Sequence, residues 1–278
     1  MGRHLQDDIH EKSMKDPEGF WMKQAEALQW QRKPSSALVR KQKTMSDGTT
    51  HPHWSWFPDG EISTCYNCID RHVLNGAGDR MAIIWESPVT GESETYTYNE
   101  LLKEVETLAG VLKEEGVKKG HVVLIYMPMV PAALFAMLAI GRIGAIHAVV
   151  FGGFSPPSLA QRIEASKPDI IMTASCGIEA GKAPIAYRDL IRSAIQKSSF
   201  KPTKTIIWQR DQLRWHPLLK ADGERNWQRL VKSARNRGLK ADAIPVRSSD
   251  GIYIIYTSGE SFFNISILVF KQTAHREP

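Results

Sequence analysis

The chain has 278 residues, of which 42% are hydrophobic, 24% charged and 9% aromatic, and its formal net charge is +6. These values are typical of one large or two small globular domains, and they exclude a disordered or fibrous chain. No window holds the roughly 18 uninterrupted apolar residues of a membrane span, and the N-terminus lacks the apolar stretch of a secretory signal. We therefore expect a cytoplasmic protein that does not cross a membrane.

Residues 1–75 predict an irregular helical arm. The stretch "PEGFWMKQAEALQW" (17–30) spaces apolar residues among polar ones and favours a helix. The stretch "KPSSALVRKQKTMSDGTTHPH" (33–53) favours a long loop. The overlapping stretch "GTTHPHWSWFPDGEIS" (48–63) is aromatic but has no period, which is typical of a segment laid across another surface.

Cys65 and Cys68 have the CxxC spacing of some zinc sites, and His51, His53 and His72 lie near them. A second cysteine pair is missing, however, and the histidines do not have the spacing of a zinc finger. Three cysteines are also a poor disulfide framework for a chain of this size. We expect ordinary structural cysteines and no metal site.

From Met81 onward, short apolar stretches alternate with amphipathic ones. The clearest helix is 97–116, where Thr97 and Glu100 have the spacing of a capping box, worth about 1 kcal/mol, and Gly116 favours a stop. The other predicted helices are 131–144, 156–166, 183–196 and 223–238, and the predicted strands are 80–87, 92–98, 121–127, 145–151, 169–174, 204–210 and 251–256.

Nearly all-apolar strands separated by amphipathic helices predict an α/β fold, in which a parallel sheet is flanked by helices. Ligands of such sheets bind at the carboxyl ends of the strands.

Positive charge is concentrated between Lys201 and Arg247, where twelve basic residues accompany four acidic ones. The helix predicted at 223–238 places its apolar residues on one face and its basic residues on another. This patch could attract a polyanion, such as nucleic acid or a phosphorylated ligand. A solvated helix face is the favoured interpretation.

Several common sites are excluded by their motifs. Gly76 and Gly78 form a GxG that precedes a strand, so a dinucleotide-binding loop is not indicated. No GxxxxGKS loop or GxSxG elbow is present. His147 lies in an apolar strand, which favours a core histidine with hydrogen-bonded ring nitrogens over a catalytic one. The stretch "FGGFSPP" (151–157) follows a strand and opens a helix, with Ser155 in a position to cap it.

The remaining candidate is "IYIIYTSG" (252–259), in which small hydroxyl residues and glycine follow a buried strand. Thr257, Ser258 and Gly259 would expose backbone N–H groups and hydroxyls that can hold phosphate oxygens. Because many strand-to-turn exits use the same residues, the chemistry alone leaves a simple turn open.

Several long stretches resemble, in order, the N-terminal half of short-chain acyl-CoA synthetases, which are adenylate-forming enzymes. "YIIYTSG" is similar to the start of their AMP-binding signature, which continues T-T-G-x-P-K-G. The others are "DPEGFW", "WFPDGEISTCYNCIDRHV", "VLIYMPMVPAALFAMLAIGRIGAIHAVVFGGFSPPSLAQRI" and "TASCGIEAGKAP". The resemblance covers about residues 16–259 and is closest to the acetyl-CoA and propionyl-CoA synthetase group. It implies that residues 76–259 form part of the adenylation domain.

This resemblance implies a ligase that uses ATP, CoA and Mg²⁺. ATP and a short carboxylate would give an acyl-adenylate, which CoA would convert to acyl-CoA and AMP. Thr257, Ser258 and Gly259 would begin the loop that holds the triphosphate.

The resemblance also aligns Glu179, Ala180, Gly181 and Lys182 with the segment that meets CoA. Acetyl-type enzymes carry two arginines there. In this chain Glu179 replaces one and Lys182 the other, so that only Lys182 keeps a cation, as a point charge and not as a bidentate fork.

After Gly259 the resemblance stops. Glu260 stands where the family has a hydroxyl residue, and a carboxylate there would repel a triphosphate by roughly 1–4 kcal/mol. The family's acyl-pocket residues, magnesium ligand and lysine-bearing C-terminal domain have no counterpart. We therefore expect residues 260–278 to be an aberrant tail, such as translated intron, and this chain to have no catalytic residues and no activity by itself.

Two alternatives stay open. One is a non-catalytic module that binds CoA or a nucleotide, or that pairs with a full-length homologue. The other, less favoured, is nucleic-acid binding through the basic region 201–247. The resemblance does not choose acetate over propionate, and it allows a mitochondrial protein as well as a cytoplasmic one.

Overall fold

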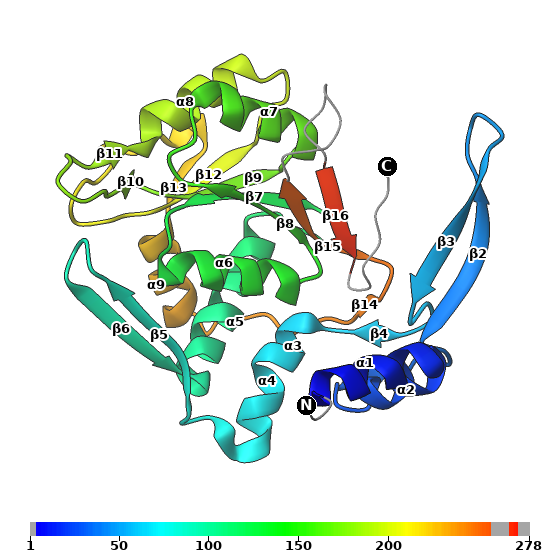
Figure 1. Cartoon of the computed structure of the whole chain (residues 1–278). Coiled ribbons are helices and arrows are strands. Elements are labelled where there is room, and N and C mark those ends of the chain that lie inside the picture. Colours follow the sequence, from blue (N-terminus) through cyan, green and yellow to red (C-terminus); the bar gives the residue numbers. More distant parts are fainter. Residues whose placement is uncertain (1–3, 257–266, 272–278) are drawn as a thin grey trace.

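The computed structural model describes residues 4–256 and 267–271. Its centre is a seven-stranded sheet with the order β13-β12-β9-β7-β8-β15-β16 (Figure 1). The first six strands are parallel, and β16 pairs with β15 in the antiparallel sense. The strands are β7 (Val122–Met127), β8 (Ile146–Phe151), β9 (Ile170–Ala174), β12 (Lys204–Trp208), β13 (Glu224–Asn226), β15 (Gly251–Tyr256) and β16 (Ile267–Lys271).

Helices cover both faces of this sheet, which confirms the predicted α/β class. On one face lie α5 (Tyr98–Glu114), α6 (Pro131–Arg142) and α9 (Trp227–Asn236). On the other lie α7 (Pro156–Ser166) and α8 (Tyr187–Lys197) (Figure 1). The central strands β7 and β9 are buried on both faces, as their continuous apolar sequences require.

The helix predicted from its capping box forms as expected. The Thr97 hydroxyl accepts a bond from the Glu100 N–H, and the Glu100 carboxylate accepts one from the Thr97 N–H at 2.8 Å. Beyond the helix, Gly116 has a φ of +102°, a conformation that favours glycine.

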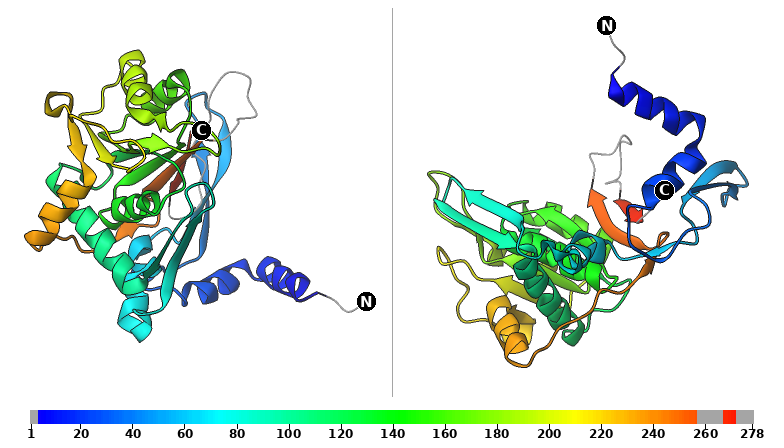
Figure 2. Two further views of the ribbon diagram at one scale, coloured as in Figure 1. Left: turned by 90° about the vertical axis from the view of Figure 1, so that its left-hand side faces the viewer. Right: turned by 90° about the horizontal axis from the view of Figure 1, so that it is seen from below.

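The N-terminal part begins with two helices, α1 (Leu5–Lys15) and α2 (Pro17–Ala25), which extend away from the body of the molecule (Figure 2). The short strands β1 (Trp30–Arg32), β4 (Glu61–Ile62) and β14 (Val246–Arg247) form a small sheet. The segment then continues through α3 (Thr64–Cys68), α4 (Asp70–His72) and a π-helical turn, η1 (Val73–Ala77).

The prediction of a long loop at 33–53 is wrong, because this region forms a hairpin of β2 (Leu38–Thr44) and β3 (Thr50–Trp56). The Asp47 carboxylate accepts bonds from the N–H and hydroxyl of Thr49, at 2.9 and 2.6 Å, and Gly48 has a φ of +83°. This turn brings the strands together, and the Arg40 guanidinium stacks over the Trp54 ring at 5.0 Å.

Smaller elements complete the fold. β5 (Met81–Ser87) and β6 (Glu92–Thr97) form a separate antiparallel hairpin, as two strands were predicted there. β10 (Cys176–Gly177) and β11 (Ile185–Ala186) form a second, shorter hairpin between β9 and α8, and η2 (Lys220–Asp222) precedes β13.

A buried ion pair joins the N-terminal part to the main sheet layer. The Arg142 guanidinium on α6 donates two bonds to the Asp70 carboxylate, at 2.7 and 2.9 Å, and a third bond to the Ala241 carbonyl at 2.7 Å. Only 3% of the Arg142 side chain is exposed. Cys65 lies 3.6 Å from the same guanidinium, and burial raises the pKa of its thiol to about 12. Cys65 is therefore a neutral core residue.

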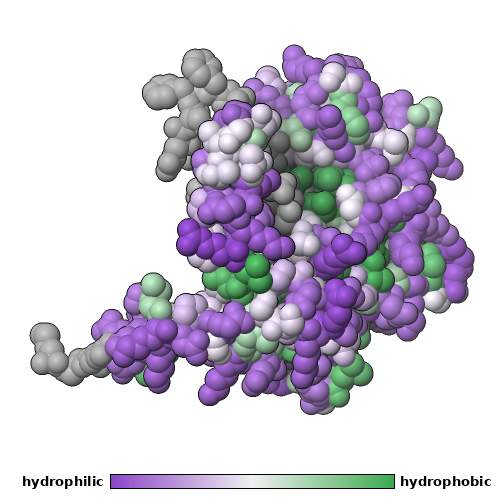
Figure 3. Space-filling view, turned by 90° about the vertical axis from the view of Figure 1, so that its right-hand side faces the viewer, coloured by the Kyte–Doolittle hydropathy of each residue, from purple (hydrophilic) through white to green (hydrophobic). Residues whose placement is uncertain are grey.

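The face shown in Figure 3 is mostly hydrophilic, with apolar areas among the hydrophilic ones. Val149, Phe151 and Ile255 are exposed and lie on the same face of the neighbouring strands β8 and β15. Among the residues that the structure describes, no helix is long and apolar enough to cross a membrane.

Candidate functional site

The direction in which the chain crosses the sheet reverses after β8. From β7 the chain moves to β8 on one side, and then returns to β9 and β12 on the other side of β7. In open parallel sheets, ligands bind at the carboxyl ends of the strands beside such a reversal. The loops that follow β7, β8 and β9 therefore form the candidate site.

The loop after β8 is held by a tyrosine at the end of β7. The Tyr126 hydroxyl donates a bond to the Phe154 carbonyl at 2.9 Å and accepts one from the Gly153 N–H at 3.0 Å. Burial raises the pKa of Tyr126, so this hydroxyl keeps its proton. Gly153 has a φ of +110°, and its Cα faces open space. The glycine loop is therefore fixed in place, and a ligand can approach its backbone closely.

Ser155 takes the N-cap position of α7, as predicted, but its side chain makes no capping bond to the helix. Its hydroxyl donates instead to the Ser158 hydroxyl at 3.3 Å.

Two glycines in this region make room for the buried side chain of Tyr187. A Cβ atom at Gly152 would lie 2.6 Å from the Tyr187 hydroxyl and 2.8 Å from the Met127 carbonyl carbon. A Cβ atom at Gly177 would lie 2.4 Å from the same hydroxyl. The Tyr187 ring in turn packs against Tyr126, with 4.9 Å between ring centroids.

Replacement of Gly177 by alanine is expected to displace Tyr187, because the added methyl group overlaps its ring and hydroxyl. We expect a destabilisation of about 1–3 kcal/mol, measured by urea denaturation. Gly141→Ala in α6 is the matched control, because Gly141 also has an ordinary φ and no atom of the described residues lies near its Cβ. The double variant Gly177→Ala with Tyr187→Phe should recover part of the loss, and an unchanged midpoint for Gly177→Ala would contradict the explanation.

The end of β15 lies beside the same loop. The Tyr256 hydroxyl donates a bond to the Arg162 carbonyl of α7 at 3.2 Å. The Arg162 guanidinium lies over the rings of both Phe154 and Tyr256, at 4.6 and 5.2 Å. The predicted phosphate-loop residues Thr257, Ser258 and Gly259 follow directly and lie outside the described residues, so their role stays a prediction.

The predicted CoA segment, Glu179, Ala180, Gly181 and Lys182, joins β10 to β11. The Lys182 ammonium donates to the Glu179 carboxylate at 2.6 Å, and this bond raises the pKa of Lys182. Both side chains are exposed, at 68% and 50% respectively. Lys182, the cation expected to meet CoA, is therefore paired with Glu179, the carboxylate that replaces an arginine of the acetyl-type enzymes.

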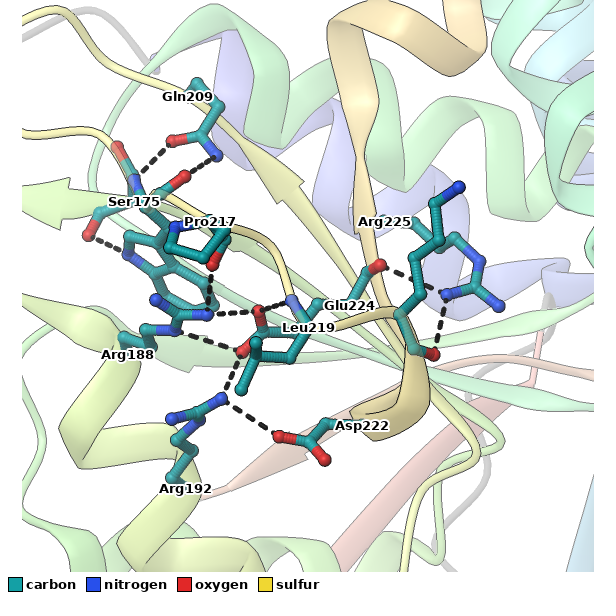
Figure 4. Close-up of polar contacts among 11 residues, drawn as sticks. Ser175, Arg188, Arg192, Gln209, Pro217, Leu219, Asp222, Glu224 and Arg225 are labelled. Atoms are coloured by element: carbon teal, nitrogen blue, oxygen red, sulfur yellow. Dashed lines mark hydrogen bonds and ion pairs between the residues drawn. The ribbon is translucent and has the colours of Figure 1, made fainter.

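The base of this hairpin is anchored by a polar network that sequence reasoning missed (Figure 4). The Glu224 carboxylate of β13 accepts two bonds from Arg188, at 3.1 and 2.6 Å, and one from Arg192 at 3.0 Å. It also accepts the Leu219 N–H at 2.8 Å. Burial alone would raise the pKa of Glu224, but the bonds from Arg188 and Leu219 and the charges of both arginines outweigh it and hold that pKa below its ordinary value.

Trp215 connects the network to the strand end. Its indole N–H donates to the Ser175 carbonyl at 2.7 Å, and the Arg188 guanidinium lies 5.6 Å from its ring centroid. Because Arg188 and Ser175 flank the β10–β11 hairpin, these contacts fix the direction in which that hairpin leaves the sheet.

His147 lies in the core strand β8, as predicted, but within the described part of the chain one of its ring nitrogens lacks the hydrogen-bond partner that was expected. Its ring stacks on Tyr253 of β15 at 5.6 Å, and among the described residues its Nδ1 atom has no hydrogen-bond partner. Burial lowers the pKa of His147 to about 4, so the ring is neutral at pH 7.

Cys65 and Cys68 lie on one helical turn, the first buried and the second exposed. Across residues 4–256 and 267–271, no group of three or more His, Cys, Asp or Glu residues is placed to hold a metal ion.

A parallel sheet that places a fixed glycine loop and the end of β15 beside a reversal of chain direction defines an α/β protein built to bind a ligand at that edge. A family model described as AMP-binding enzyme matches residues 70–259, and one described as acetyl-coenzyme A synthetase N-terminus matches residues 6–68. The chain belongs to the AMP-binding enzyme family, and its relatives are short-chain acyl-CoA and acetyl-CoA synthetases.

Two relatives illustrate this similarity. The mitochondrial acyl-CoA synthetase short-chain family member 3 of Pongo abelii is 43% identical over 248 residues, which is 89% of this chain and 34% of the relative. The acetyl-coenzyme A synthetase of Leptospira biflexa is 37% identical over 256 residues, 91% of this chain and 37% of the relative. The chain thus spans about a third of the length of these proteins.

A solved structure, the acetoacetyl-CoA synthetase from Streptomyces lividans, has the same fold. It superimposes with a TM-score of 0.79 at 19% sequence identity, over 97% of this chain and 38% of that one. These comparisons confirm the family resemblance seen in the sequence.

Proposed function

We propose that the chain is the N-terminal portion of an AMP-forming ligase that joins a short carboxylate, propionate or acetate, to CoA. The observation that carries this proposal is the common placement of the Gly153 loop, held by Tyr126, and the end of β15, held by Arg162, at the reversal of the sheet. Backbone N–H groups at such an edge suit the phosphates of ATP.

The proposed acyl substrate is supported by the names of the two relatives described above, which concern short-chain and acetyl groups. Within this function, residues 1–75 and 76–259 are proposed as the N-terminal arm and the adenylation unit. ATP and CoA are its proposed substrates. We assign no step to Mg²⁺, because the part of the chain that the structure describes offers no cluster of ligands for it.

The decisive experiment is an assay of the purified chain with ATP, CoA, Mg²⁺ and either propionate or acetate, followed by pyrophosphate release and acyl-CoA formation. We expect no turnover, because this chain is proposed to be inactive by itself; formation of one thioester would overturn that expectation and identify the substrate. Saturable binding of ATP and CoA without product would support the alternative, a non-catalytic nucleotide- and CoA-binding module. The absence of binding would contradict that alternative.

The paired state of Lys182 leads to a prediction about CoA. Glu179→Gln removes the carboxylate that occupies the ammonium group, and we expect it to tighten CoA binding about threefold to tenfold, the size of one exposed charge contact. Lys182→Ala should weaken binding by a similar factor. Calorimetric titration with CoA measures both, and Lys113→Ala, an exposed lysine of α5, is the charge-matched control. Equal affinities in all four proteins would remove residues 179–182 from the CoA site.

The compartment is proposed from the relatives as well. The Pongo abelii protein is named as mitochondrial, which supports a mitochondrial location over the cytoplasmic one expected from composition. Imaging of a C-terminally tagged chain beside a mitochondrial marker distinguishes the two.

A further inference from the structure

A large groove lies along the side of α9, apart from the Gly153 loop and bordered by the Glu224 network. It has a volume of about 1120 Å³ and runs between the tip of the β5–β6 hairpin, the loop that follows β12, and the segment from η2 to α9. A smaller cavity of about 350 Å³ adjoins it and shares Trp208 and Gln228 with it. We call the two together the α9 groove.

One wall of the α9 groove is formed by cations that no carboxylate neutralises. Among the described residues, none of four basic side chains makes an ion pair: Lys220, Arg225, Arg229 and Lys232. The Arg225 guanidinium donates only to the carbonyls of Lys220 and Glu224, at 3.4 and 3.1 Å (Figure 4).

The nearby carboxylates are already engaged elsewhere. On α5, Glu104 pairs with Arg235 and Glu114 pairs with Arg237 at 2.7 Å. Asp222 and Glu224 pair with Arg192. These contacts neutralise the outer end of α9 and leave the excess positive charge on the groove side. As predicted, α9 buries Trp227, Val231 and Ala234 and exposes its basic residues.

Three of these cations follow one another in the chain. Arg225 lies in β13, and Arg229 and Lys232 are three residues apart in α9, where such residues are neighbours on the helix surface. An extended peptide places alternate side chains about 7 Å apart on one face. The long side chains of arginine and lysine can reach successive carboxylates at that spacing.

The other wall carries the opposite charge. Glu92 and Glu94 of β6 line the groove, and Gln212 donates to Glu92 at 3.3 Å. A nucleic acid has a phosphate at every residue, and these carboxylates repel it. An extended peptide has two different faces, and the face without acidic residues can lie against Glu92 and Glu94.

We propose that the α9 groove binds an extended, acidic segment of a partner protein, with its carboxylates on Arg225, Arg229 and Lys232. Half-buried Trp208 and Leu230 line the groove and supply an apolar surface for its backbone and small side chains. This site is separate from the Gly153 loop and independent of the proposed ligase activity.

The test uses the full chain and a fluorescein-labelled peptide of alternating aspartate and serine, followed by fluorescence anisotropy. We expect saturable binding that weakens as salt is raised, because the contacts are screened charges. The double variant Arg229→Gln with Lys232→Gln should bind at least about tenfold more weakly, since it removes two charge contacts. Lys41→Gln with Lys43→Gln on β2 removes the same charge from exposed positions far from the groove and should leave affinity unchanged.

Circular dichroism of each variant shows whether the fold is intact, and the single variant Arg229→Gln, which should also weaken binding, replaces the double variant if that one does not fold. Equal loss of affinity in the β2 variant would show non-specific attraction and overturn the proposal. Tighter binding of a single-stranded oligonucleotide than of the peptide, through the same cations, would also overturn it.

Discussion

Replacement of Asp70 by asparagine is expected to destabilise the protein by about 3–5 kcal/mol. Asp70 neutralises Arg142 through two hydrogen bonds, and the Arg142 side chain is almost completely buried. Removal of one member of a buried pair leaves the other charge without compensation, and this is the main source of the loss. Equilibrium unfolding in urea measures it directly.

The control for this prediction is Glu114→Gln, which breaks an ion pair with similar geometry to Arg237 at the surface. It should leave the unfolding midpoint nearly unchanged, because water screens an exposed pair. The double variant Asp70→Leu with Arg142→Leu tests the origin of the effect, since removal of both charges should cost less than removal of one. A loss for Asp70→Asn no greater than that for Glu114→Gln would show that the buried pair contributes little.

Protonation of His147 between pH 6.5 and 4 is expected to lower the free energy of unfolding by about 3 kcal/mol. The pKa of this residue falls from about 6.5 in the unfolded chain to about 4 in the fold, because the ring is buried. The unfolded state therefore binds the proton first, so the contribution is fully present above pH 6.5 and is lost as the pH falls toward 4. The measurement is the free energy of unfolding at a series of pH values.

His147→Phe should remove this part of the pH dependence, because phenylalanine can stack on Tyr253 but cannot be protonated. The variant His10→Phe, at an exposed position of α1, should retain it. Glu224 adds a separate loss at lower pH, because its own pKa is held below the ordinary value, and its stabilising effect is lost as the pH falls through that lowered pKa. An unchanged slope between pH 6.5 and 4 in His147→Phe would contradict the assignment.

Most strands and helices of the main sheet were predictable because their signals are local, but β13 lies within the predicted helix 223–238 and β16 within the predicted tail. The capping box of Thr97 and Glu100 depends on residues three apart, and the continuous apolar sequences of β7 and β9 follow from burial on both faces. The β2–β3 hairpin was missed because its strands are polar and exposed, so no alternation of apolar residues marks them. The turn at Asp47 and Gly48 was the one available signal.

The candidate site was only partly predictable. The Gly153 loop was visible as a pattern, but its fixation by Tyr126 joins residues 27 apart. The Glu224 network joins residues 36 apart. The lack of a hydrogen-bond partner for His147 Nδ1 among the described residues depends on the pairing of β8 with β15. None of these contacts leaves a mark in the local sequence, because each is created when separate elements pack.

The order of strands in the sheet also has a consequence for how the protein is made. Each of β7, β8, β9 and β12 pairs with a strand close to it in the chain, whereas β15 joins β8 across about 100 residues, as the partners His147 and Tyr253 show. Contacts between residues this far apart in the chain form late in folding, because the chain loses entropy before the contacts contribute any stabilising energy. During synthesis on the ribosome, the edge of β8 that pairs with β15 therefore stays unpaired while the region from α7 to β14 is translated. This unpaired edge of β8 is the surface on which a nascent-chain chaperone would act.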